Sequence, residues 1–296
     1  MDATVKEARR MKIAIAIATT GRPRTVAETL RRLTRQTRAP DRLVVVGAAT
    51  EDAPQVTQGA EFFVAPGRGL SLQRNHALDL IADEADVVVF IDDDYVPEPG
   101  FLAGVERLFT DRGEVVAASG HLIADGIHSR GLTFEEADAL IAAYRQPGDY
   151  RLVDDTGTYG CNMAFRLSAA PRVRFDENLP LYSWLEDTDF SAQYARVGRV
   201  VRTNHFAGVH LGVKSGRTPG VRLGYSQIVN PLYLVRKGTA APRFALGLAS
   251  RNLIANIVKS LRPEPWIDRR GRLRGNLLAL ADIARGRADP RRVLEL

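Results

Sequence analysis

The sequence predicts an α/β protein with an open, mostly parallel central sheet and a helical, basic C-terminal extension. Short runs rich in valine and isoleucine alternate with segments whose apolar residues recur at helical spacing. This is the order expected of strands that are joined by crossover helices. Glycine and proline between the runs mark the turns.

The first half of the chain shows the alternation most regularly. We expect strands over 12–18, 42–47 and 61–65 and helices over 26–36 and 70–85. ADVVVFI (85–91) is continuously apolar, as in a strand that is buried on both faces. In open α/β sheets ligands bind beyond the carboxyl ends of the strands, so the residues after the first and last of these strands are candidates for one crevice.

The second half is less regular but contains both kinds of element. Strand-like segments cover 114–123, 158–166 and 198–204, and helical patterns cover 134–144 and 185–198. From about residue 220 the chain is helical and basic, in three stretches that cover 220–238, 243–261 and 273–286.

Length and cysteine content limit the class of protein. The chain has 296 residues, of which 45% are hydrophobic, so it can bury a core. Its single cysteine, Cys161, excludes an intrachain disulfide framework and fits a reducing compartment. The start, MDATVKEARR, is charged where a signal peptide is apolar, and no run of 18 apolar residues occurs. We therefore expect a cytoplasmic protein, with the inner face of the membrane as the place of any lipid contact.

The net charge of +6 is unevenly distributed along the chain. Residues 236–296 carry 14 Lys and Arg against 5 Asp and Glu, whereas residues 1–235 carry 27 against 30. A basic tail suggests contact with an anionic surface, either nucleic acid or membrane. Nucleic-acid binding through RRGRLRG (269–275) has only charge in its favour, since Trp266 is the one neighbouring aromatic. We expect no nucleic-acid partner.

Three consecutive carboxylates, Asp92, Asp93 and Asp94, follow the strand at 85–91. Adjacent like charges disfavour one another's ionisation, so the functional interpretation is a cation that offsets them. Oxygen ligands suit Mg²⁺ or Mn²⁺, and Mg²⁺ commonly binds one or two carboxylates together with substrate phosphates. The alternative is a solvated acidic turn. The position behind a buried strand favours the metal.

A second acidic pair, Glu186 and Asp187, begins the helix expected over 185–198. Acids at a helix N-terminus often do no more than complement the helix dipole. The functional interpretation is a general base that the same positive end keeps ionised. His205 and His210 come after the strand-like 198–204. A lone histidine is more often structural than a ligand, but we expect His210 in a glycine-flanked loop, where a neutral imidazole could complete a metal site.

The order of these motifs resembles that of the inverting GT-A glycosyltransferases of the large family 2 type, over roughly residues 12–215. IAIATTGRP resembles the first strand and nucleotide-contacting turn of the family, GLSLQRNHAL its segment ending in Arg-Asn, and VVFIDDDYVPEPG its DxD region. GCNMAFR resembles the strand that shapes the acceptor side, and WLEDTDFSAQYARVG resembles the helix with the catalytic acids.

The resemblance implies a role for each acid. Asp94 would bind a divalent cation, Mn²⁺ or Mg²⁺, with Asp92 and Asp93 near the ribose, the metal or the diphosphate of a donor. Asp187 would be the catalytic base, and Glu186 would orient the acceptor hydroxyl.

The resemblance also implies contacts with the donor. Arg74 would face the nucleotide, and Thr19, Thr20 and Arg22 would line its base and ribose. The family often carries an acidic pair after its second strand that recognises the base, whereas this chain has Gly47-Ala48-Ala49-Thr50, so Asp52 is the candidate substitute. On the acceptor side, Trp184 stands next to the acidic pair, where it would wall the site.

The implied function is metal-dependent, inverting transfer of a sugar, of the hexosyltransferase type, from a nucleotide-diphosphate sugar to a hydroxyl of a saccharide or lipid-linked acceptor. The setting would be bacterial surface polysaccharide or glycolipid synthesis. The alternative is a non-catalytic sugar-nucleotide-binding or scaffolding protein that keeps the fold, which the presence of both Asp94 and Asp187 argues against. The expected organisation is an N-terminal extension over 1–11, a GT-A domain over 12–218 with nucleotide half 12–112 and acceptor half 113–218, and a basic helical extension over 219–296.

The helix expected over 243–261 has two interpretations. One stripe of it carries Leu246, Leu253, Ile257 and Leu261, and another face has Arg243, Arg251 and Lys259 available. Such a helix either packs its stripe on the domain or lies on anionic lipid. The second would give peripheral membrane contact through the C-terminal basic helices.

Overall fold

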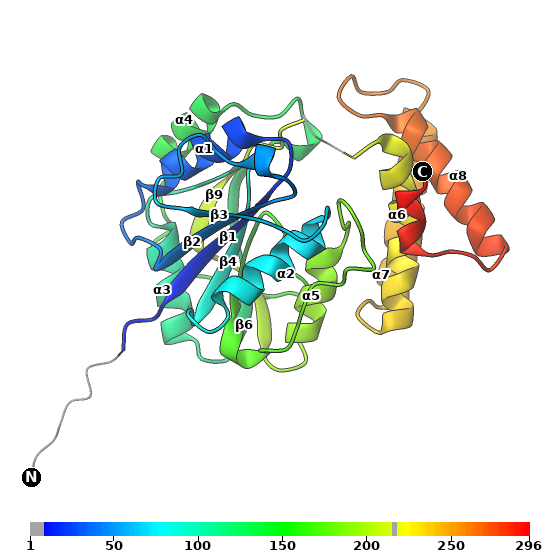
Figure 1. The fold of residues 1–296 in the computed structure, drawn as a ribbon. Helices are drawn as coiled ribbons and strands as arrows, with labels where there is room; N and C mark the ends of the chain where they lie inside the picture. The colour runs from blue at the N-terminus through cyan, green and yellow to red at the C-terminus, as the bar shows by residue number, and fades with distance from the viewer. Residues whose placement is uncertain (1–8, 215–217) are drawn as a thin grey trace, which may run out of the picture.

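The computed structural model describes residues 9–214 and 218–296, so most of the expected N-terminal extension, residues 1–8, lies outside the described residues. An α/β domain is followed by a group of three long helices that packs against one side of it (Figure 1). None of the helices in the described part of the chain is both long and apolar enough to cross a membrane.

One sheet organises the α/β domain, in the order β3-β2-β1-β4-β8-β6-β9-β5, with β7 paired to β9. Its strands are β1 (Ile13–Thr19), β2 (Arg42–Gly47), β3 (Glu61–Val64), β4 (Val87–Asp92), β5 (Tyr95–Pro97), β6 (Val115–Asp125), β7 (Leu152–Asp154), β8 (Asn162–Arg166) and β9 (Arg199–His210). The first four strands are parallel, and β8 runs antiparallel to both β4 and β6. Because β6 and β9 again point the way of β1, six of the nine described strands share one direction, which confirms the mostly parallel sheet.

Helices cover both faces of the sheet. They are α1 (Pro23–Leu33), α2 (Leu70–Ile81), α3 (Phe101–Asp111), α4 (Phe134–Ala143) and α5 (Glu186–Tyr194), followed by α6 (Gly220–Lys237), α7 (Pro242–Lys259) and α8 (Arg269–Ala284). Successive side chains of a strand point to opposite faces. In β1 the isoleucines therefore enter the core beneath α1 and α3, and the alanines enter the core beneath α2 and α5. Burial on both faces explains why these strands are continuously apolar.

The expected strands and helices are all present, although their ends differ by a few residues. The helix α3 and the strands β5 and β7 were not predicted. The helix α3 has a recoverable pattern, because its buried residues Phe101, Leu102, Val105, Leu108 and Phe109 recur at helical spacing. The other two are strands of three residues, too short to show a period.

One expectation about local structure was wrong, because His210 is the last residue of β9 and not part of a loop. It pairs with Tyr95 of β5 and with Asp125 of β6. The preceding glycine, Gly208, serves close packing: a Cβ there would come within 2.4 Å of the Tyr95 hydroxyl. The flanking glycine that suggested a loop is therefore a requirement of the sheet.

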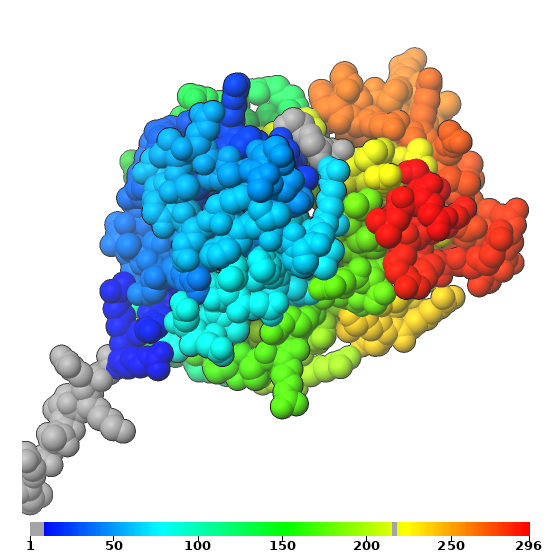
Figure 2. Space-filling view, viewed as in Figure 1, coloured from blue at the N-terminus to red at the C-terminus, as the bar shows by residue number. Residues whose placement is uncertain are grey.

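The three C-terminal helices have a small core of their own, formed by Tyr225, Ile228, Val229, Ala279 and Val293. Figure 2 shows them, in yellow to red, lying against the green segment that contains α5. The junction contains buried charge. Lys237 Nζ lies 2.7 Å from Asp189 Oδ2 and 2.6 Å from Asp176 Oδ2, and the Thr239 hydroxyl donates to Asp189 Oδ1 at 2.7 Å. Since Asp189 lies on α5, these contacts tie that helix to α6.

Candidate active site

The acidic triplet lies at the carboxyl edge of the sheet, where β1 and β4 end side by side. Asp93 is buried and joins the two strands: its Oδ2 accepts from the Thr19 hydroxyl at 2.7 Å and its Oδ1 accepts from Arg22 Nη1 at 2.9 Å. Burial and the neighbouring Asp94 raise the pKa of Asp93, against the opposing charge of Arg22. Asp93, Thr19 and Arg22 thus form one polar cluster at the edge of the crevice.

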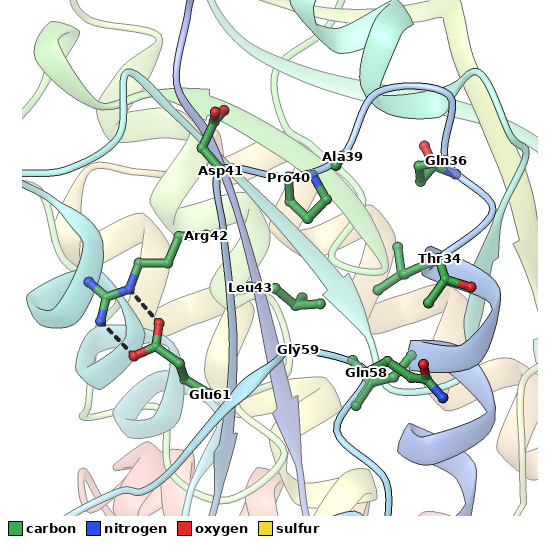
Figure 3. Close-up of a pocket in the computed structure, with 12 residues that line it drawn as sticks. Thr34, Gln36, Ala39, Pro40, Asp41, Arg42, Leu43, Gln58, Gly59 and Glu61 are labelled. Carbon is green, nitrogen blue, oxygen red and sulfur yellow. Dashed lines mark hydrogen bonds and ion pairs between the residues drawn. The ribbon is translucent and has the colours of Figure 1, made fainter.

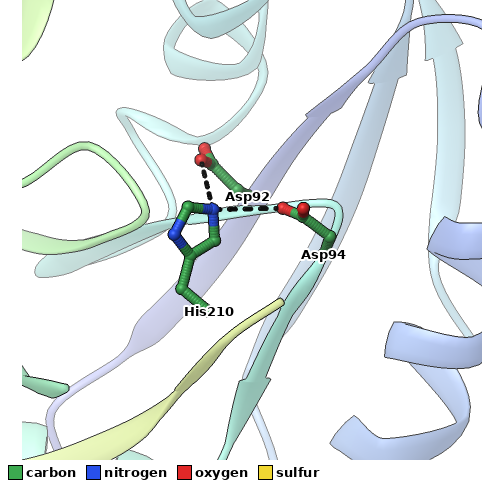
Figure 4. A group of neighbouring side chains, drawn as sticks. All are labelled: Asp92, Asp94 and His210. Carbon is green, nitrogen blue, oxygen red and sulfur yellow. Dashed lines mark ion pairs between the residues drawn. The ribbon is translucent and has the colours of Figure 1, made fainter. Parts of the chain in front are cut away.

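The other two acids of the triplet meet His210 (Figure 4). His210 Nε2 lies 3.5 Å from Asp94 Oδ1 and 3.9 Å from Asp92 Oδ2, and one ligand atom of each of the three residues lies within 4.8 Å of the others. The second ring nitrogen, Nδ1, lies 2.8 Å from Asp125 Oδ1. A histidine whose other nitrogen is held by a carboxylate is the usual arrangement at metal sites. Asp125 was not found from the sequence.

The electrostatics of this cluster favour a positive charge. Burial lowers the pKa of His210, but Asp125, Asp94 and Asp92 together raise it to about 10. Burial would raise the pKa of Asp94, yet the contact with His210 and the charge of Arg22 hold it below its usual value. Two carboxylates and an imidazole are donors that suit Mn²⁺ or Mg²⁺. The residues of the Asp92–Asp94–His210 cluster therefore fit a divalent cation.

The second acidic pair is preceded by a strained turn. Leu181, Ser183 and Leu185 have φ angles of 58°, 51° and 75°, a left-handed conformation that is unusual for residues with a Cβ. The segment is held in place by Leu70, whose N–H donates to the Leu181 carbonyl at 2.8 Å, and by Ser71, whose N–H donates to the Ser183 hydroxyl at 3.2 Å. Such strain costs roughly 1–3 kcal/mol per residue and is concentrated at functional sites.

Glu186 and Asp187 form the first turn of α5. Asp187 Oδ2 accepts from the Gly160 N–H at 2.9 Å and its Oδ1 accepts from the Thr188 N–H at 2.7 Å. Burial raises the pKa of Asp187, and these two bonds oppose the rise. For Glu186, burial and the charge of Asp187 outweigh Arg74 and raise the pKa to about 8. A carboxylate with a fixed orientation and a raised pKa is suited to accept a proton.

Arg74 connects the two acidic groups. Its Nη1 lies 2.5 Å from Glu186 Oε1, its Nη2 lies 3.2 Å from Asp92 Oδ1, and Nη2 also donates to the Gly160 carbonyl at 2.8 Å. The guanidinium lies over the rings of Phe90 and Phe175, and its side chain is only 3% exposed. These contacts hold Arg74 between the two acidic groups, and its expected contact with the nucleotide stays a prediction.

The remaining donor-side candidates lie around the ends of β1 and β2. Asp52 is buried and accepts from the N–H groups of Gly21, Ala48 and Ala49, so its carboxylate holds the two turns together. The Thr20 hydroxyl lies 3.4 Å from Gln73 Oε1. Gln73, which the sequence analysis did not single out, donates to the carbonyls of Thr19 and Val46 at 2.6 and 2.8 Å. The predicted donor residues thus lie together, although Asp52 is already engaged by backbone.

Trp184 lies half-buried before α5, and its carbonyl accepts from Asn230 Nδ2 of α6 at 2.8 Å. Its backbone is therefore fixed by the C-terminal helices.

A hollow of about 320 Å³ lies away from these residues (Figure 3). Asp41, Arg42 and Glu61 line it at the amino ends of β2 and β3, where the Arg42–Glu61 ion pair crosses one side. This is the edge of the sheet opposite to the acids, so the hollow is not part of the candidate active site.

Comparison with known proteins finds a family whose model matches this chain. The family model described as glycosyl transferase family 2 matches residues 14–173, which is more than half of the chain. No curated protein matches the chain in a sequence comparison.

Solved structures of S. aureus TarS share the fold. The chain superposes on TarS 1–349 in complex with UDP-GlcNAc with a TM-score of 0.58, 14% identity and coverage of 96% of this chain and 83% of that one. For TarS 1–349 alone the TM-score is 0.54, with 15% identity and coverage of 96% and 82%. For a longer TarS chain the TM-score is 0.47, with 16% identity, and the match covers 74% of this chain and 40% of that one. The family match and the fold confirm the GT-A type of architecture that the sequence motifs implied.

Proposed function

The chain belongs to glycosyl transferase family 2, and we propose that it is a metal-dependent, inverting transferase that moves a hexosyl group from a nucleotide-diphosphate sugar to an acceptor hydroxyl. One observation carries the proposal: Arg74 contacts both Asp92 of the candidate metal cluster and Glu186, the chain neighbour of the candidate base Asp187. A leaving diphosphate and an attacking hydroxyl need such groups next to one another.

The metal part of the proposal rests on the donor set. Asp92, Asp94 and His210 would hold the cation, and Asp125 would fix the imidazole so that Nε2 faces the two acids. When bound, a divalent cation supplies stabilisation of the negative charge that develops on the leaving diphosphate. Because Nε2 must lose its proton to become a ligand, the acids that raise the pKa of His210 also attract the ion that replaces this proton.

The acid–base part of the proposal rests on Asp187. Its carboxylate, fixed by the N–H groups of Gly160 and Thr188, takes the proton from the acceptor hydroxyl as the oxygen forms its bond to the anomeric carbon. The carbon–oxygen bond to the diphosphate breaks on the opposite side, so the anomeric configuration inverts. Glu186 orients the same hydroxyl, and Trp184 forms a wall of the acceptor site.

The donor and acceptor are narrower proposals. Thr19, Thr20 and Arg22 would line the nucleotide, with Asp52 shaping the turns that contact it. UDP sugars are the first donors to test, because the related fold of TarS was solved with UDP-GlcNAc. We assign the acceptor to saccharides or lipid-linked saccharides, in surface polysaccharide or glycolipid synthesis at the inner face of the membrane. The basic C-terminal helices would provide peripheral membrane contact.

One experiment distinguishes the proposed transferase from the second candidate, a sugar-nucleotide-binding or scaffolding protein without activity. Thermal unfolding is followed with UDP, GDP, dTDP and CMP sugars, each with and without Mn²⁺, because selective binding to the folded state raises its stability by mass action. The donor identified in this way is then incubated with Mn²⁺ and simple saccharide acceptors. Transfer with inversion, measured by NMR of the product, supports the enzyme. Donor binding without transfer or hydrolysis supports the scaffold.

A further inference from the structure

The helix α7 packs on its neighbours through small and polar side chains. Ala245 is buried and Ala249 contacts the core of the C-terminal helices. Asn256, only 1% exposed, donates from its amide to Gln227 Oε1 of α6 and to Asn276 Oδ1 of α8, both at 2.9 Å. The inner face of α7 is therefore partly a hydrogen-bonded amide network, which is the reverse of the usual amphipathic arrangement.

Five large aliphatic side chains of α7 and of the turn after it are exposed. We define the outer face of α7 as five residues that are 49–81% exposed: Leu246 (69%), Ile254 (59%), Ile257 (49%), Val258 (61%) and Leu261 (81%). The last four are spaced by three, one and three residues, so they lie on one side, and Leu261 continues that side into the turn after the helix. Of the stripe expected from the sequence, only Leu253 packs against the inner core.

The charged side chains of α7 itself, and of the chain after it up to residue 263, have one sign. Arg243, Arg251 and Arg262 are exposed, and no Asp or Glu occurs between residues 238 and 263. The first acid after the helix, Glu264, already bonds Lys259 at 2.7 Å and Arg269 at 2.8 Å. Trp266, in the turn that follows, is 38% exposed. A tryptophan with both an apolar ring and an N–H is typical of the boundary between lipid and water.

We infer that the outer face of α7 docks on an anionic lipid surface. Aliphatic side chains on a helix whose charged residues are all basic match a layer with apolar chains beneath acidic headgroups. A second copy of the chain would bring two basic faces together, which like charges disfavour. A protein partner is the less suitable occupant because interface cores are enriched in aromatic anchors seated in pockets, whereas this face is a row of exposed aliphatic groups on one helix.

The location of the outer face agrees with this assignment. Phe244, in the first turn of α7, lines a hollow of about 200 Å³ together with Tyr159 and Thr188. These two residues are the chain neighbours of Gly160 and Asp187. The docking helix therefore starts beside the candidate catalytic helix. The inference does not depend on the proposed reaction, because lipid binding needs neither donor nor metal.

The test is cosedimentation of the full chain with vesicles, without donor. We expect binding to phosphatidylcholine vesicles that contain phosphatidylglycerol, weaker binding to pure phosphatidylcholine, and weakening by salt. Ile257→Glu with Leu261→Glu removes two apolar groups and adds two negative charges, so the partition coefficient should fall at least about tenfold. The matched control is Val153→Glu with Val197→Glu, which makes the same change at exposed sites of the α/β domain and should bind as the unchanged chain does.

Three results would overturn the inference: no binding of the unchanged chain to acidic vesicles, equal losses in the two double variants, or unaltered binding by Ile257→Glu with Leu261→Glu. Sedimentation velocity separates the alternative of self-association. If the unchanged chain does not bind vesicles but forms a dimer, and Ile257→Glu with Leu261→Glu dissociates that dimer, the outer face of α7 belongs to an interface with a second copy. Circular dichroism and thermal unfolding establish that both double variants are folded, which is expected because all four positions are exposed.

Discussion

Replacing Arg74 by methionine tests the link between the two acidic groups. The change removes the guanidinium but keeps much of the side-chain volume. Glu186, whose side chain is 8% exposed, then has a buried carboxyl without its cation, and the Gly160 carbonyl loses its donor. Breaking a buried pair by removing one partner costs about 3–5 kcal/mol, and Glu186, with its pKa of about 8, is the charged partner of such a pair only above that pH. The low end, about 3 kcal/mol, is expected here, because Asp92 is 35% exposed and water replaces its partner.

The same variant has a pH dependence of defined sign. Glu186 has a pKa of about 8 in the folded protein, above its unfolded value, and the loss of Arg74 raises it further. In the folded variant Glu186 therefore keeps its proton at pH values at which Glu186 of the unchanged protein has released it. The loss of stability therefore grows as pH rises past 8, and each additional unit of pKa contributes about 1.4 kcal/mol.

The assay is urea unfolding at pH 6.5 and pH 9, with Arg166→Met as the control. Arg166 also lies over an aromatic ring, that of Phe109, but it donates only to backbone carbonyls, so its replacement should cost the same at both pH values. If Arg74→Met costs less than about 1 kcal/mol, or if its cost is independent of pH, the proposed ion pair with Glu186 is not what holds the two groups together.

The other predictions concern the reaction. Asp187→Asn keeps volume and removes the proton acceptor, so turnover should fall by about 10²- to 10⁴-fold while donor binding persists; a loss below tenfold would assign the base elsewhere. His210→Ala should raise the Mn²⁺ concentration that gives half-maximal activity, whereas His205→Ala, which removes a ring stacked on Tyr150, should not; the opposite pattern would exclude His210 as a ligand. Asp125→Asn should raise the same Mn²⁺ concentration by about 10- to 100-fold, because the imidazole of His210 loses the partner that orients it. An unchanged Mn²⁺ concentration would make Asp125 purely structural.

Local sequence pattern predicted the elements that carry the site. The isoleucines and alanines of β1 alternate between two cores, so the strand had to be apolar at every position, and the same holds for β4. Polar residues then stand where these strands end. The proximity of Asp93, Thr19 and Arg22 follows from the parallel pairing of β1 with β4.

Features that depend on distant residues could not be predicted in this way. Gly208, two residues before His210, suggested a loop. The reason for a glycine there is the close approach of Tyr95, which lies 113 residues away in the chain. Asp125 meets His210 only through the pairing of β6 with β9. In α7 the helical period was correct, but its orientation was not evident, because Gln227 and Asn276 decide which face turns inward.

The most direct test of the account is release of nucleoside diphosphate by the unchanged chain and by Asp94→Ala, measured with the identified donor and acceptor in Mn²⁺ and in excess chelator. Asp94 is held by the Val213 N–H and faces His210, and it lies outside the hydrophobic cores, so the variant should fold and still bind the nucleotide. We expect the unchanged chain to release nucleoside diphosphate in Mn²⁺ but not in chelator, and the Asp94→Ala variant to release none under either condition. Equal release in chelator, or an Asp94→Ala variant as active as the unchanged chain, would contradict metal-dependent transfer at this site.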